Sequence, residues 1–139
     1  QGDKSLPMER VYRHISWSGP YLQPYQDFTL DEHLKLHFRF RKCLVDDPSE
    51  LINILELEPH RDKKLRFYSS GMLQRVKVGT ALFTSSDVLL LDEPTSNMDP
   101  GNASRMLNLI EQYRENRCYV LASNMPREYE GFEQKLQLG

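Results

Sequence analysis

The feature that most constrains the fold of this chain is the apolar run Val88–Leu91, which ends in Asp92 and Glu93. Such a run before an acidic pair predicts a buried strand of an α/β sheet, and ligands of these sheets bind beyond the carboxyl ends of the strands. One carboxylate there can hold a magnesium ion while its neighbour orients or deprotonates a water, and phosphoryl transfer needs both functions. A strand that ends in a solvated acidic turn would show the same residues.

A second candidate site lies at the start of the helix expected just before this strand. Ser69, Ser70 and Gly71 are small residues that let backbone N–H groups approach an anion, and the helix dipole favours negative charge there. One face of the expected helix carries Met72, Val76, Gly79 and Phe83. The segment therefore suits a terminal phosphate, although a serine N-cap of an ordinary surface helix has the same sequence.

The remaining residues predict helices and strands in alternation. Strands are expected at Val11–Trp17, Asp87–Asp92 and Cys118–Ser123, with a last candidate strand in residues 135–138. Thr29 and Glu32 form a capping box, and Asp47 is expected to cap a further helix that begins at Pro48. We therefore expect residues 29–59 to be all helical, and the sheet to be covered by helices on both faces.

Composition narrows the function classes. The 139 residues include 18 Lys and Arg against 20 Asp and Glu, so no overall field favours nucleic acid, which is not expected as a partner. Cys43 and Cys118 lack metal spacing and are expected to be reduced, buried thiols. No apolar run approaches the length of a membrane span, and the opening residues lack the apolar core of a signal peptide.

Three motifs, in this order, resemble those of ATP-binding-cassette (ABC) ATPases. YSSGMLQRV is similar to their signature motif, VLLLDEP to their Walker B strand and SNMD to their D-loop. The likeness is to compact ATPase subunits of bacterial transporters of the Bacteroidetes type. It implies an α/β fold, a partial P-loop NTPase core with a helical subdomain. Residues 1–28 would form a strand and Q-loop region, residues 29–67 a helical arm, and residues 68–139 the signature helix and the Walker B half.

The resemblance also implies roles for individual residues. Asp92 would support Mg²⁺, and Glu93 would be the general base of ATP hydrolysis. The Ser69–Gly71 segment would contact the γ-phosphate of ATP bound to a second ATPase subunit, and Asp99 would communicate across that dimer. The helical arm would bind an integral membrane transporter subunit, which places the protein on the cytoplasmic face of the inner membrane.

Several positions depart from the family pattern. Ser70 and Met72 replace a glycine and a glutamine of the signature. Simple alignment puts Pro20 at the Q-loop glutamine, which Gln23 could supply after a small loop shift. Asn124 stands where the family usually has the switch histidine, so it can donate a hydrogen bond to a phosphate but cannot carry a charge near neutral pH.

The largest departure is that no G-x-x-x-x-G-K-[ST] phosphate loop occurs in the 139 residues. The family places this Walker A motif upstream, so we expect a fragment of an ABC transporter ATP-binding protein that is inactive alone. Two alternatives are a non-transport ABC-type ATPase, acting in DNA repair, translation or cluster assembly, and a non-enzymatic interaction domain.

Two smaller features have ordinary explanations. His33 and His37 could form half of a zinc site, but a solvated helix face is the simpler interpretation. The segment HFRFRK could stack on nucleic-acid bases, but it more simply continues the same helix. PREYEGFE, which follows Asn124, has no assigned role.

Overall fold

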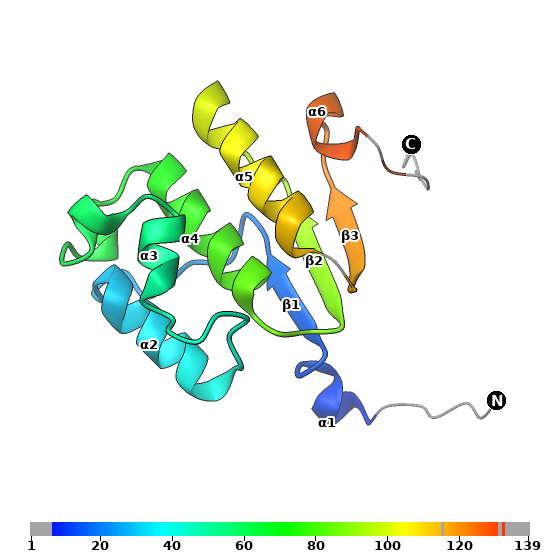
Figure 1. Ribbon diagram of the computed structural model, residues 1–139, viewed down its shortest axis with the longest axis horizontal. Helices are drawn as coiled ribbons and strands as arrows, with labels where there is room; N and C mark the ends of the chain where they lie inside the picture. The colour runs from blue at the N-terminus through cyan, green and yellow to red at the C-terminus, as the bar shows by residue number, and fades with distance from the viewer. Residues whose placement is uncertain (1–6, 115, 131, 133–139) are drawn as a thin grey trace.

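Three parallel strands form the centre of the structure, a computed structural model that describes residues 7–114, 116–130 and 132. The strands β1 (Ile15–Ser18), β2 (Val88–Asp92) and β3 (Cys118–Ala122) lie in the order β1-β2-β3 (Figure 1). Ser18 is level with Leu91, and Asp92 is level with Ala122. The carboxyl ends of all three strands therefore meet at one edge, as the α/β prediction requires.

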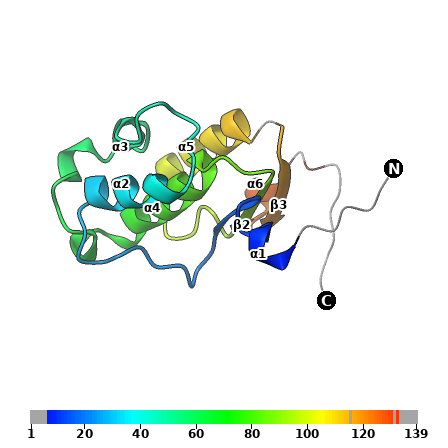
Figure 2. The same cartoon turned by 90° about the horizontal axis from the view of Figure 1, so that it is seen from below.

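The helices lie largely to one side of this sheet (Figures 1 and 2). They are α1 (Met8–Val11), α2 (Leu30–Phe40), α3 (Glu50–Ile54), α4 (Ser70–Phe83), α5 (Pro100–Tyr113) and α6 (Pro126–Tyr129), with 3₁₀ turns at Glu58–His60 and Leu65–Phe67. The helix α4 packs on β1 and β2 and contacts α5, while α2 and α3 lie beyond it, away from β3. Among the described residues, none of the helices combines the length and the apolar character needed to cross a bilayer.

One hydrophobic core joins the helical part to the sheet. Its fully buried members include Leu30, Leu34, Leu51, Ile52, Val76, Phe83 and Leu89. Each large apolar side chain buried in this way contributes about 1.5–3 kcal/mol relative to exposure. The sheet and residues 29–67 thus share one core.

The opposite face of the sheet is open within the described part of the chain. Leu89 and Leu91 are buried under the helices, whereas Trp17 is 48% exposed and Val120 is 50% exposed. Cys118 begins the same strand as Val120 and is also exposed, with a free thiol. The expectations of a sheet covered on both faces and of a buried Cys118 are therefore wrong, because an apolar strand does not reveal what covers it.

Local hydrogen bonds decide where elements begin. The capping box is confirmed: Thr29 N donates to Glu32 Oε2 at 2.8 Å, and Glu32 N donates to Thr29 Oγ1 at 3.2 Å. Asp47 instead accepts a 2.9 Å bond from Ser49 N, so a turn precedes α3, which begins at Glu50 rather than at Pro48. The first strand begins only at Ile15, because residues 11–14 form the end of α1 and a turn. The candidate strand at 135–138 lies outside the described residues.

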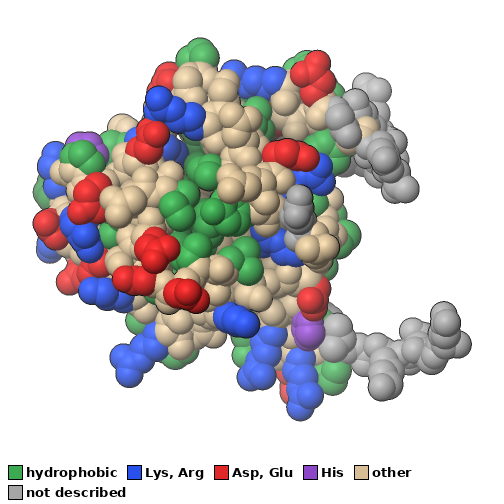
Figure 3. Space-filling view, in the orientation of Figure 1, with side chains coloured by type: hydrophobic (Ala, Val, Ile, Leu, Met, Phe, Trp, Pro, Cys, Tyr) green, Lys and Arg blue, Asp and Glu red, His purple; other side chains and the backbone are tan. Residues whose placement is uncertain are grey.

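Charged side chains of both signs are mixed over the surface. Figure 3 shows Lys and Arg interspersed with Asp and Glu over the helical end of the molecule, around a central group of hydrophobic side chains. This agrees with the near balance of charge in the sequence.

Candidate functional site

The acidic pair lies at the carboxyl edge of the sheet. Asp92 is the last residue of β2, and Glu93 continues the pairing because its N–H donates to Ala122 O at 2.8 Å. Asn124 follows Ala122 by two residues and is exposed. The structure therefore brings Asp92, Glu93 and the Asn124 segment to one edge, as the sequence predicts.

The backbone of Glu93 is held in an unusual conformation. Its φ is 47°, in the left-handed region that costs a residue with a side chain about 1–3 kcal/mol. The buried amide of Gln74 donates to Glu93 O at 3.1 Å and to Pro94 O at 3.2 Å. Such strain persists where the surroundings fix it, and here α4 and β3 fix it from two sides. The backbone of Glu93 is thus held by both α4 and β3.

The loop after Glu93 is tied to the short helix α6. Thr95 N donates to Glu128 Oε1 at 2.9 Å, and the Thr95 hydroxyl donates to the same oxygen. Thr95 and Glu128 are 1% and 4% exposed. Sequence reasoning missed both residues as well as Gln74; Gln74 lay inside the recognised signature segment, and Glu128 inside the unassigned PREYEGFE.

The segment Ser69–Gly71 begins α4 and lies against the backbone of Asn97 and Met98. Ser69 caps the helix by accepting a 3.2 Å bond from Met72 N, while Ser69 and Ser70 are exposed. A Cβ on Gly71 would come within 2.7 Å of Asn97 O, so this close approach requires glycine. Both Asn97, with φ of 60°, and Gly71 belong to the segments that the family motifs identify.

Asp99 occupies the N-cap of α5. Its carboxylate accepts a 3.0 Å bond from Asn102 N, and the hydrogen bonds from Asn102 lower the pKa of Asp99 below its ordinary value. A carboxylate at a helix N-terminus is favoured by the same bonds and by the helix dipole. Asp99 is exposed and follows by two residues Asn97, the residue whose carbonyl lies against Gly71.

Gln23 lies in a different place, in a cavity of about 690 Å³ along the outer edge of β1. The wall of this β1-edge cavity also includes His33 and His37 of α2 and Lys77 of α4. Burial lowers the pKa of His33 to about 4, and His37 hydrogen-bonds the Thr84 hydroxyl at 2.9 Å. The two histidines are therefore not on a solvated helix face, and that interpretation is wrong.

Metal binding by the side chains of the described residues is limited. Among them no group of three or more His, Cys, Asp or Glu side chains could hold a metal ion, at the histidine pair or elsewhere. Magnesium, however, is commonly bound by one or two carboxylates together with substrate phosphates and waters. Magnesium binding at Asp92 therefore stays a prediction.

A parallel sheet with an acidic pair at its carboxyl edge, beside a helix that begins with small residues, is the arrangement in which α/β proteins bind phosphate-bearing ligands. The chain belongs to the ABC transporter family, whose members bind ATP: the family profile described as "ABC transporter" matches residues 6–96.

Individual relatives agree with this assignment. The chain is 34% identical over 122 residues to the ABC transporter ced-7 of Caenorhabditis elegans, covering 85% of this chain and 7% of that protein. It is 32% identical over 129 residues to the phospholipid-transporting ATPase ABCA3 of Mus musculus, covering 89% of this chain and 8% of that protein. The chain thus spans less than a tenth of the length of these relatives. Both are animal proteins, so the likeness to bacterial Bacteroidetes-type subunits stays a prediction.

Solved structures share the fold. An ABC transporter ATP-binding protein from Pyrococcus furiosus is similar with a TM-score of 0.71 and 20% identity, covering 88% of this chain and 62% of that one. A structure described as the ATP-binding subunit of an ABC transporter is similar with a TM-score of 0.70 and 23% identity, covering 88% and 54%. The partial P-loop NTPase fold predicted from the sequence is thereby confirmed.

Proposed function

We propose that this chain is the signature-helix and Walker B part of an ATPase that couples ATP hydrolysis to transport across a membrane. The observation that carries the proposal is the left-handed backbone of Glu93, which Gln74 and Ala122 hold at the carboxyl edge of the sheet. A general base must be placed within hydrogen-bond reach of its water, and a fixed backbone supplies that placement. The names of the relatives, a phospholipid-transporting ATPase among them, support transport as the coupled process.

Each residue at this edge would have its own role in ATP hydrolysis. Glu93 would orient the attacking water and accept its proton, and Asp92 would hold the magnesium ion or one of its waters. The Mg²⁺ ion, when bound, neutralises charge on the phosphates. Asn124 would donate its amide N–H to the γ-phosphate as a neutral group. The phosphate loop would come from a part of the protein outside these 139 residues, and the open sheet face around Trp17 and Val120 offers an apolar surface for that part.

A second ATPase subunit is the proposed partner of the signature segment. The helix α4 has 14 residues, and its first turn is exposed at Ser69 and Ser70. Unpaired N–H groups and the dipole of such a helix attract a phosphate. Asp99 is exposed, and Asn97 and Met98 just before it lie against Gly71, which supports its proposed role in communication between the two subunits.

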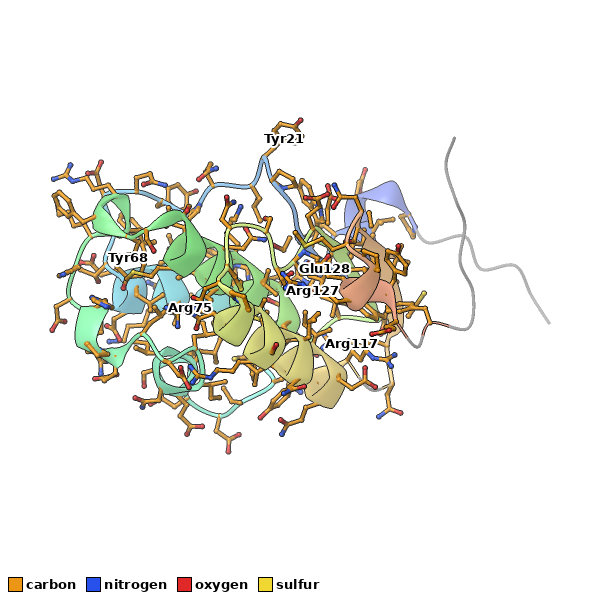
Figure 4. The ribbon with its side chains drawn as sticks, turned by 90° about the horizontal axis from the view of Figure 1, so that it is seen from above. Tyr21, Tyr68, Arg75, Arg117, Arg127 and Glu128 are labelled. Carbon is orange, nitrogen blue, oxygen red and sulfur yellow. The ribbon has the colours of Figure 1, made fainter. Side chains whose placement is uncertain are left out.

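An integral membrane subunit is the proposed partner of the helical arm, residues 29–67. The β1-edge cavity has an apolar and aromatic wall together with cationic Arg41 and Lys77, which suits an amphipathic segment with an acidic residue. Tyr25 at its margin is 66% exposed, and Tyr21 projects away from the molecule (Figure 4). Such docking would place the protein on the cytoplasmic face of the membrane.

The test compares three carboxylates of β2 and its ends in the intact protein that includes a phosphate loop. Glu93→Gln should lower kcat for ATP about 10²–10⁴-fold and leave Mg·ATP binding in place. Asp92→Asn should raise the Mg²⁺ concentration that half-saturates the reaction. Asp87→Asn is the matched control, because Asp87 lies just before the opposite end of the same strand, paired with His14. Full turnover in Glu93→Gln would overturn the proposal.

The coupled process needs its own test. Co-purification of the intact protein with an integral membrane protein would support transport. Recovery in a complex without one, with ATP turnover preserved, would favour the non-transport ATPase. Absence of any nucleotide binding by the intact protein would favour the interaction domain.

A further inference from the structure

We propose that Glu128 is a positioning residue for ATP hydrolysis, acting through Thr95 on the backbone of Glu93; the inference rests on the function proposed above. Thr95 follows Glu93 by two residues, and it meets Glu128 from 33 positions further along the chain. The pair joins the loop after β2 to the segment after β3. These are the two segments that hold the proposed base and the proposed phosphate ligand.

The contact is built around one buried oxygen. Glu128 Oε1 accepts both the Thr95 N–H, at 2.9 Å, and the Thr95 hydroxyl. Glu128 is 4% exposed, and Figure 4 shows its side chain directed from α6 into the body of the molecule. Burying a carboxylate costs free energy unless hydrogen bonds compensate for the lost water, and Thr95 supplies two such bonds. The same two bonds fix the position of Thr95.

The fixed Thr95 completes the restraint on Glu93. Gln74 holds the carbonyl groups of Glu93 and Pro94 from α4, and Ala122 O holds the Glu93 N–H from β3. Glu128 holds the next residue of the loop from α6. Without this last restraint the left-handed Glu93 can relax, because only the surroundings keep such a conformation.

The position of α6 extends the same restraint to Asn124. The helix begins at Pro126, two residues after Asn124, and Met125 N is bonded to the Ser123 hydroxyl at 2.9 Å. A movement of the Glu93 loop is therefore transmitted through Glu128 to the Asn124 segment. We infer that the contact keeps the base and the phosphate ligand at a constant separation.

The second oxygen of Glu128 decides which replacement at this position is conservative. Glu128 Oε2 is buried and has no hydrogen-bond partner among the described residues. Glu128→Gln would keep an acceptor for both Thr95 donors and place an amide in the position of Oε2. It is therefore the conservative replacement, whereas Glu128→Ala removes the acceptor and leaves the hydroxyl of Thr95 only its long contact with Met125 Sδ, at 3.9 Å.

The first experiment measures steady-state hydrolysis of Mg·ATP by the intact protein. A displacement of the base of about 1 Å can cost about 100-fold in rate, so Glu128→Ala should lower kcat roughly 10- to 100-fold. KM for ATP should change less than about threefold, because the phosphate loop supplies most ground-state contacts. Glu128→Gln should recover most of the lost kcat. An unchanged kcat in a folded Glu128→Ala variant would overturn the inference.

The second experiment asks whether Glu128 acts through Glu93. In the Glu93→Gln background, Glu128→Ala should leave the residual rate unchanged, since the group that it positions is already absent. An independent loss in that background would assign Glu128 a separate, structural role. Should Glu93→Gln itself keep full turnover, the proposed function fails; a Glu128→Ala variant of normal kcat beside an inactive Glu93→Gln refutes only this inference.

Variants of Thr95 keep the test decisive if Glu128→Ala does not fold. Thr95→Val preserves volume and removes the hydroxyl, and should lower kcat about tenfold. Thr95→Ser retains the hydroxyl and should remain within about twofold of the parent. Equal kcat values for these two variants would contradict the positioning role.

Discussion

Gly71→Ala tests whether the signature helix and the D-loop are packed as closely as the structure shows. The new Cβ would lie 2.7 Å from Asn97 O and 3.9 Å from Met98 Cα, so backbone rather than a flexible side chain must move. Overpacking of this kind costs about 1–3 kcal/mol. Because alanine favours the helix more than glycine does, the substitution also stabilises α4 by up to about 1 kcal/mol. The net expectation is a loss of about 1 kcal/mol in the free energy of unfolding.

Gly101→Ala is the matched control, because Gly101 and Gly71 are each the second residue of a 14-residue helix. The Cβ at Gly101 would be 3.3 Å from Asp99 Oδ1, the capping oxygen of α5, which would need to shift by only a few tenths of an ångström. The propensity gain is the same in both variants, so their difference of about 1–3 kcal/mol isolates the clash. Urea unfolding of the chain, followed by circular dichroism, measures it. The reasoning is refuted if Gly71→Ala is as stable as Gly101→Ala.

Three further results are expected. The 139-residue chain alone should not hydrolyse ATP, since it contains no phosphate loop; magnesium-dependent turnover that Glu93→Gln abolishes would contradict this. The pKa of the half-buried His33 is lowered from an ordinary 6.5 to about 4, so that as the pH falls the unfolded chain takes up this proton before the folded chain does. The free energy of unfolding should therefore fall by about 2 kcal/mol between pH 7 and pH 5. In urea unfolding, the midpoint of His33→Gln should not show this fall. In the intact protein, Asn124→Ala should lower ATP turnover, and Asn124→His should give turnover a pH dependence with a step near pH 6.5. If neither variant changes turnover, Asn124 is only a turn residue.

Local signals in the sequence predicted the elements that local bonds determine. The Thr29 and Glu32 box begins α2, and its two bonds join residues three positions apart. The apolar run before Asp92 predicted β2 and its acidic edge. By contrast, the aromatic and β-branched residues Val11–Tyr12 suggested a strand, but the structure places them in the end of α1 and a turn.

Tertiary contacts explain what the sequence did not reveal at the site. Gln74 and Glu128 contact the Glu93 loop across 19 and 33 positions, and no periodic pattern encodes such pairs. The exposure of Trp17 likewise depends on what else packs on the sheet. The proposed roles of Glu93, Asn124, Gln23 and the signature residues remain predictions, since they concern a bound nucleotide.

The sheet also sets the order in which the chain can fold during synthesis. His14 and Asp87, which flank the ladder between β1 and β2, are 73 positions apart. At a translation rate of about 5–20 residues per second, β1 waits roughly 4–15 s before its partner strand leaves the ribosome. Helices α2 to α4 rely on contacts closer in sequence and can form within that interval. Until then the edge of Ile15 and Trp17 that pairs with β2 in the folded chain stays unpaired.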